Sequence, residues 1–215
     1  MSPAAEPAEP EARWPIAIAL LGTGGVSLSL PHSLVLGPRW LLIVIVAALV
    51  VPATIAHRAG RHDIDRRIGY AISSVLTLGL AASLALLITT VVSKTETPVS
   101  LLRSAAALWV TNVLVFAIWY WRLDAGGPHR REARGRHTSG AFFFPQMMDG
   151  APVENPESWT PRFVDYVFLA FNTSTAFSPT DTAVLSRWAK ALSMTQAVIS
   201  LLIVAILASR AVGML

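Results

Sequence analysis

The chain has 215 residues, of which 53% are hydrophobic and only 14% charged, and its formal net charge is +4. This balance argues against an ordinary soluble domain and is typical of a protein built mainly from membrane-spanning helices. The absence of cysteine excludes disulfides, thiolate metal sites and thiol nucleophiles.

Five long stretches contain no Asp, Glu, Lys or Arg. A charge at the centre of a bilayer costs roughly 2.5–3.5 kcal/mol on insertion scales, so charge-free stretches of this length predict transmembrane helices. They cover residues 14–38, 40–57, 68–93, 104–121 and 191–209. We therefore predict an all-α membrane protein with a bundle of five long transmembrane helices and, as argued below, one short polar-ended C-terminal membrane segment.

The N-terminal part divides into a tail and a four-span region. Residues 1–13 are rich in Pro, Ala and Glu and predict a disordered tail. Residues 14–122 hold the first four spans, with Pro52 as a kink in the second. In the third span, small residues repeat every four positions and predict a close contact with a neighbouring helix. These small residues are Gly79 with Ser83, and Ala81 with Ala85.

Arginine placement predicts the orientation. Segments 57–67 and 122–136 hold nine Arg, whereas segments 31–39 and 93–103 hold three basic residues. The positive-inside rule then places both Arg-rich segments, and the N-terminus, in the cytoplasm. Arginine confined to short loops beside the spans argues against a nucleic-acid partner. Arg outnumbers Lys 15 to 2, which is typical of high-GC coding and suggests a bacterial inner membrane.

Residues 123–161 form a polar, Gly- and Pro-rich stretch that we expect to be a cytoplasmic linker. It contains the apolar run Ala141 to Pro145, with three consecutive Phe. This run has two interpretations, an insertion into the membrane interface or a docking site for a partner.

Residues 162–215 form the C-terminal part, a short segment followed by the last transmembrane helix. The apolar part of the segment, residues 163–177, is about 22 Å long as a helix, short for a full crossing. Its second half is crowded with polar side chains, which lipid cannot satisfy. These side chains either pack inside the protein, with Asp181 and Thr182 capping the last helix, or line a cavity for a small solute or ion. The candidate cavity residues are Asn172, Thr173, Ser174, Thr175, Ser178, Thr180 and Asp181.

The side of the C-terminus depends on this short segment. If it crosses the membrane, the last helix runs inward; if it turns back, Arg187 and Lys190 stay cytoplasmic and the C-terminus lies outside. We predict crossing, with both termini in the cytoplasm, because Arg210 then obeys the positive-inside rule.

Three polar residues outside this segment suggest structural roles. Asn112 and Gln196 lie inside spans, where amides most often form interhelical hydrogen bonds. Asp124 follows a helix end, where its charge opposes the helix dipole, and we expect Arg122 or a loop arginine to offset it.

Two resemblances follow from these residues. The order of short aromatic segment, Ser/Thr-rich turn and long last helix resembles the pore helix and inner helix of two-span potassium channels. The glycine-containing filter of that family is absent, because no Gly lies between Arg162 and Leu192. More specifically, Leu108 to Pro128 and Thr175 to Asp181 resemble segments of an uncharacterised family of bacterial multi-pass membrane proteins. That resemblance covers most of the chain and implies no known activity.

Motifs of enzymes and cofactor sites are absent from the sequence, so we expect neither catalysis nor a cofactor. The five histidines, at positions 32, 57, 62, 129 and 137, fall at span edges or in loops without metal-ligand spacing, and we expect no metal. The function we expect is structural or accessory within the lipid bilayer, with a second copy or another membrane protein as partner. The alternative is a channel-like protein that conducts an unidentified small solute or ion through the Asn172–Asp181 turn.

Overall fold

The computed structural model describes residues 14–93, 96–132, 140–148, 151, 159–175 and 181–212. The predicted disordered tail, residues 1–13, lies outside the described residues, and the linker 123–161 is described only in part. The long helices are α1 (Trp14–Ser29), α2 (Leu41–Arg58), α3 (His62–Ser93), α4 (Pro98–Leu123) and α7 (Arg187–Val212). The shorter elements are η1 (His32–Leu34), η2 (Asp124–Gly126), α5 (Pro128–Glu132), β1 (Phe142–Phe143), η3 (Pro145–Met147), α6 (Phe163–Thr175) and β2 (Ala183–Val184).

The described part of the chain is almost entirely helical, as predicted for an all-α membrane protein. Among the described residues, α2, α3, α4 and α7 are long and apolar enough to cross a membrane. Helix α1 is apolar but has only 16 residues, so it is shorter than the other four. The prediction of a fifth long helix is therefore not confirmed.

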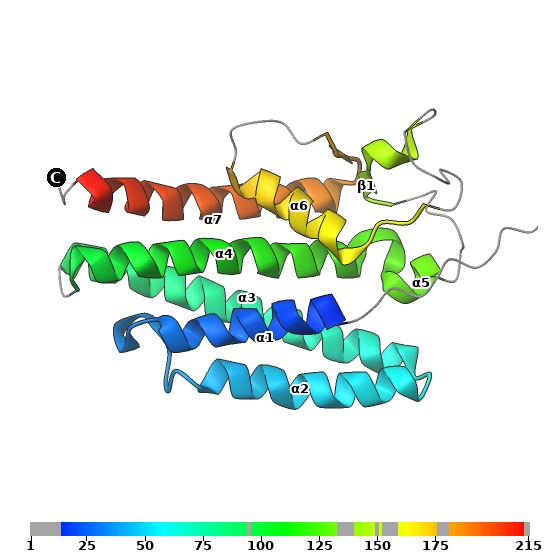
Figure 1. Ribbon diagram of the computed structural model, residues 1–215, viewed down its shortest axis with the longest axis horizontal. Helices are drawn as coiled ribbons and strands as arrows, with labels where there is room; N and C mark the ends of the chain where they lie inside the picture. Colours follow the sequence, from blue (N-terminus) through cyan, green and yellow to red (C-terminus); the bar gives the residue numbers. More distant parts are fainter. Residues whose placement is uncertain are drawn as a thin grey trace, which may run out of the picture.

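Helix α4 lies at the centre of the bundle (Figure 1) and packs against α1, α3, α6 and α7. It starts sharply, because Pro98 begins the helix and the Thr97 Oγ1 accepts a hydrogen bond from Ser100 N at 3.2 Å. It ends at a turn in which Gly126 and Gly127 have φ angles of +84° and +95°. This turn reverses the chain immediately after the central helix.

The third helix meets the second at Gly79. A Cβ added there would lie 3.3 Å from Leu42 Cδ2 of α2, so the glycine allows close approach of the two helices. Ala81 and Ala85, in contrast, are exposed on α3. The predicted small-residue contact is thus present at Gly79 and wrong for Ala81 and Ala85 within the described residues.

Both ends of the bundle can be identified from the chain reversals. We call "basic end" the end at which α2 finishes, α3 starts and α4 finishes, which carries the arginines of residues 58–67 and 122–131. Helix α1 starts there too, since Ile16 and His57 line one pocket. Helix α7 runs antiparallel to α4: Tyr120 bonds to Ser193, and Trp109 bonds to Ser200. Helix α7 therefore starts at the basic end and finishes at the opposite end, as Figure 1 shows.

The two ends of the described chain lie at opposite ends of the bundle, whereas the predicted crossing of residues 163–177 would bring them to the same end. Helix α6 starts near the end of α4, where Phe163 and Trp121 form an edge-to-face ring contact at 6.2 Å. It finishes at Thr175 beside the middle of α7, and strand β2 then pairs with β1 back at the basic end. The segment that contains α6 therefore starts and finishes at the basic end. Because α1 and α7 both start at this end, residue 14 lies at the basic end and residue 212 at the opposite end.

The phenylalanine run packs inside the protein. Phe142 and Phe144 are 0% and 3% exposed. The ring of Phe142 contacts those of Tyr120, Tyr166 and Trp188 at centroid distances of 5.1–6.3 Å. Both interpretations of this run, membrane insertion and partner docking, are wrong for Phe142 and Phe144, because these rings fill the junction of α4, α6 and α7.

Candidate functional site

A buried polar network joins α4, α6 and α7, and Gln196 of α7 is its centre. The Gln196 side chain is fully buried. Its Nε2 donates to the Ala170 carbonyl at 2.7 Å and to Ser174 Oγ at 2.8 Å, both on α6. Its Oε1 accepts from the Tyr120 hydroxyl of α4 at 2.5 Å. One amide therefore connects three helices.

Two further links extend the network towards the opposite end. Asn112 of α4 is also fully buried. Its Nδ2 donates to the backbone carbonyl of Gln196 at 3.3 Å and to Ser174 Oγ at 3.5 Å. Ser200 of α7 donates to the Ser174 carbonyl at 2.5 Å and accepts from Trp109 Nε1 at 3.0 Å. The last turn of α6 is thus bonded from both neighbouring helices, and the structure brings Asn112, Gln196 and Ser174 together.

The other candidate cavity residues have varied positions. The hydroxyls of Thr173 and Thr175 donate to carbonyls of their own helix, those of Leu169 and Asn172. Asn172 is half-buried and Asp181 is exposed. Ser178 and Thr180 lie outside the described residues.

The predicted cap of the last helix is wrong. Helix α7 starts at Arg187, several residues after Asp181 and Thr182, and Ala189 N donates to Ser186 Oγ at 3.3 Å. Serine is a favoured capping residue, so Ser186 takes the role expected of the earlier pair.

A second buried polar group closes the basic end of α4. The carboxylate of Asp124, 0% exposed, accepts from Ala141 N at 2.5 Å and from the Tyr166 hydroxyl at 2.6 Å. Arg131 is also buried, and its Nη1 donates to the carbonyls of Trp121 and Asp124 at 2.7 and 2.9 Å. A cation at a helix C-terminus stabilises the helix dipole. The Asp124 side chain thus links the end of α4 to Tyr166 and to the backbone of Ala141, and the loop arginine Arg131 bonds to its carbonyl.

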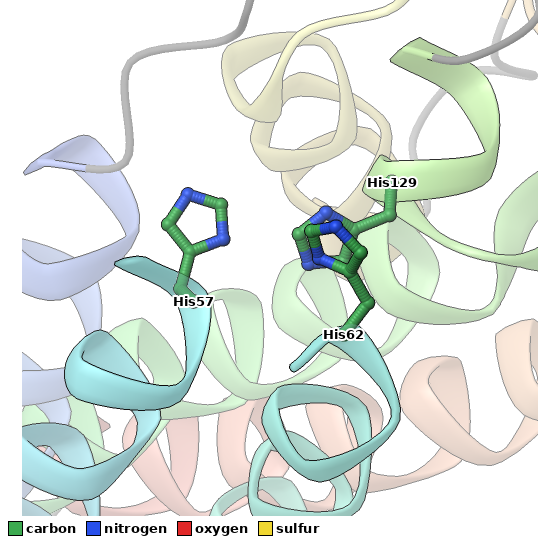
Figure 2. A group of neighbouring side chains, drawn as sticks. All are labelled: His57, His62 and His129. Atoms are coloured by element: carbon green, nitrogen blue, oxygen red, sulfur yellow. The ribbon is translucent and has the colours of Figure 1, made fainter. Parts of the chain in front are cut away.

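Three histidines converge at the basic end (Figure 2). His57 lies in the last turn of α2, His62 starts α3, and His129 belongs to α5 after the central helix. One ring nitrogen of each lies within 4.8 Å of the others. The Asp65 Oδ2 lies 2.8 Å from His129 Nε2 and 3.7 Å from His57 Nδ1. We call these four residues the histidine cluster.

Two pockets adjoin the histidine cluster. One, of about 200 Å³, is lined mainly by apolar residues of α1, α2 and α3 and reaches His57 and Asp65. The other, of about 170 Å³, is polar and is lined by His62, Asp65 and His129. Arg122 lines both pockets, and it can lie against α3 only because Gly69 has no side chain: a Cβ there would overlap the Arg122 guanidinium.

The sequence analysis missed the histidine cluster, although a signal was present. His57 and His62 are separated by four residues, within the three-to-five-residue histidine spacing of zinc sites. Both lie in an Arg-rich segment predicted to share a membrane side with the segment that contains His129. The statement that the histidines lack metal-ligand spacing was therefore wrong for this pair.

Comparisons with protein families, with characterised proteins and with solved structures return no match for this chain. The resemblances to an uncharacterised bacterial membrane family and to potassium channels therefore stay predictions.

Proposed function

We propose that this chain is a structural or accessory protein of the bacterial inner membrane, with its N-terminus and its basic end in the cytoplasm. In this proposal α1 also crosses the bilayer, as the fifth helix. Its 16 residues cover about 24 Å, which a slightly thinned bilayer accommodates at modest cost. Helix α6 then turns back inside the membrane, and the C-terminus is outside.

The observation that supports this function is the bonding of α6. A helix that ends inside the membrane must satisfy its last carbonyls within the protein, because lipid offers no donors. Here Ser200 donates to the carbonyl of Ser174 and the Thr175 hydroxyl donates to that of Asn172, two of the last four carbonyls, while Gln196 holds the preceding turn through the carbonyl of Ala170. Polar side chains that satisfy a helix end in this way act as packing elements.

The alternative is a channel-like protein, which needs polar atoms that face a passing solute. The hydroxyls of Thr173, Ser174 and Thr175 instead have partners within the helix bundle. Asn112 Oδ1 is buried and has no hydrogen-bond partner among the described residues, and it is the atom on which a conducting role would depend. The single oxygen of Asn112 favours the channel-like alternative. The hydroxyls of Thr173, Ser174 and Thr175, which all have partners, favour the packing role more strongly.

Cysteine accessibility tests the proposal, because the chain contains no native cysteine to interfere. Ser174→Cys in bacterial membranes should resist a membrane-impermeant thiol reagent added to either side, since Ser174 is 2% exposed. The controls Ser33→Cys and Arg61→Cys are exposed at opposite ends of the bundle and should react, each from one side.

Ion flux in proteoliposomes provides the second measurement. The proposal predicts no flux of K⁺, Na⁺ or Cl⁻ above that of protein-free vesicles. Flux by the native chain, together with reaction of Ser174→Cys and block of the flux by that reaction, would establish the channel-like alternative instead.

A further inference from the structure

We propose that the histidine cluster binds a divalent transition-metal ion, with His57, His62 and His129 as ligands. The proposal rests on the meeting of three imidazoles from three separate elements around one point at the surface of the basic end (Figure 2). It is independent of the structural or accessory role proposed above.

The distances suit a metal with little rearrangement. Zinc–imidazole bonds are about 2.0–2.1 Å long, so ligand nitrogens in a tetrahedral site lie about 3.3 Å apart. The three ring nitrogens are already within 4.8 Å of one another. Rotations of the side chains alone can supply the remaining movement, because His62 is exposed and His57 and His129 are partly exposed.

Asp65 provides the carboxylate that such sites commonly contain beside their histidines. Its side chain is only 13% exposed, and its Oδ2 lies 2.8 Å from His129 Nε2. A carboxylate in this position fixes the orientation of the imidazole. It also supplies negative charge in a region where Arg58, Arg66 and Arg122 line the adjoining pockets.

Imidazole ligands define the class of metal. Nitrogen-rich sites suit zinc, copper, nickel and iron, whereas magnesium and calcium prefer sites made of oxygen ligands. Three protein ligands leave one coordination position for water or an anion. The polar pocket of about 170 Å³ beside His62 and His129 gives that position access to solvent.

The backbone also favours this site. Gly60, with a φ of +68°, forms the tight turn between α2 and α3 that holds His57 and His62 together. The turn after α4 brings His129 to the same place. A metal ion would therefore cross-link the α2–α3 connection to the α4–α5 connection.

Cobalt and zinc are the probes for a test on the full-length protein in detergent, purified through a tag without histidines and stripped with a chelator. Cobalt should give the visible absorption of a tetrahedral Co²⁺ site, and equilibrium dialysis should find one Zn²⁺ per chain. His62→Ala and His129→Ala should each weaken zinc binding by at least about tenfold, and Asp65→Asn by about 10–100-fold. His62 is exposed, so its replacement leaves the fold intact.

His32→Ala is the matched control, since His32 is exposed in η1 at the opposite end of the bundle. This variant should bind zinc as the native chain does, and zinc should raise the melting temperature of both. The proposal is overturned if the native chain binds no zinc. It is also overturned if His62→Ala and His129→Ala bind zinc as tightly as the native chain does, or if His32→Ala loses binding to the same extent.

Discussion

Replacing Gln196 by Leu is the most direct perturbation of the network that joins α4, α6 and α7. Leucine has a similar volume, so the change removes three hydrogen bonds, to Tyr120, Ala170 and Ser174, with little change in packing. Interhelical hydrogen bonds in membrane proteins average about 0.6 kcal/mol each, which gives a loss of about 2 kcal/mol in the free energy of unfolding. The loss is not larger because Tyr120 also has Ser193 at 3.3 Å, and Ser174 also has Asn112.

The assay is reversible unfolding of the purified protein in mixed micelles with increasing SDS, followed by tryptophan fluorescence. Thr195→Ala is the matched control: Thr195 is the neighbouring residue, is exposed, and donates to the Ala191 carbonyl of its own helix. Its effect should stay within about 0.5 kcal/mol.

A double-mutant cycle with Tyr120→Phe isolates the bond between the Tyr120 hydroxyl and the Gln196 side chain. The double variant should be less destabilised than the sum of the single variants by about 0.6 kcal/mol, because both changes remove the same bond. Equal effects of Gln196→Leu and Thr195→Ala, or strict additivity with Tyr120→Phe, would refute the assignment of these contacts.

Three further predictions concern the contacts between helices and the topology. Gly79→Leu should lower the free energy of unfolding by about 1–3 kcal/mol through overpacking against α2, whereas Ala85→Leu on the exposed face of α3 should be nearly silent; similar effects would contradict the packing. Asp124→Asn should cost about 1.5–3 kcal/mol by thermal unfolding in detergent, since one of the two bonds to the carboxylate loses its acceptor; an unchanged melting temperature would count against that buried group. Alkaline phosphatase fused after Leu215 should be active, while fusions near residues 60 and 133 should be inactive; inactivity at all three positions would reject the turning-back of α6.

The helices were largely predictable from the sequence, because the bilayer penalises charge so strongly. The charge-free stretch 40–57 matches α2 to within one residue at each end, and the stretch 191–209 lies within α7. Helix α3 starts six residues before its charge-free stretch, since Asp63 and Asp65 in its first turn favour a helix N-terminus. Charge-free stretches therefore predict the membrane-embedded part of a helix rather than the whole helix.

The path of the C-terminal part was less predictable, because its signals conflict. The segment 163–177 is too short to decide between crossing and turning back, and the arginine at each end of α7 supports a different answer. What decides the path is the pairing of Phe142 with Val184 and of Phe143 with Ala183, a contact between strands that are far apart in the sequence. No local pattern in either two-residue strand predicts this pairing.

The polar network and the histidine cluster also differ in how far the sequence predicts them. Asn112 and Gln196 were predictable as interhelical residues from their positions inside spans, since a buried amide needs partners. Their partners Tyr120 and Ser174 depend on helix rotation and could not be assigned. The histidine cluster joins residues 57 and 62 to residue 129, and only the fold around α4 brings these segments together.

Helix α4 separates the two sites, and this separation has a physical consequence. Its contacts with α6 and α7 are fixed by buried hydrogen bonds, so that side of the bundle is held without help from the histidines. Helix α2 is the least buried of the four membrane-length helices, and its last turn carries His57. A metal held by the histidine cluster would therefore restrain the end of α2 in addition to its packing against α1 and α3. The polar network and the histidine cluster share no residue, which lets the packing of α6 and the chemistry at the basic end be tested independently.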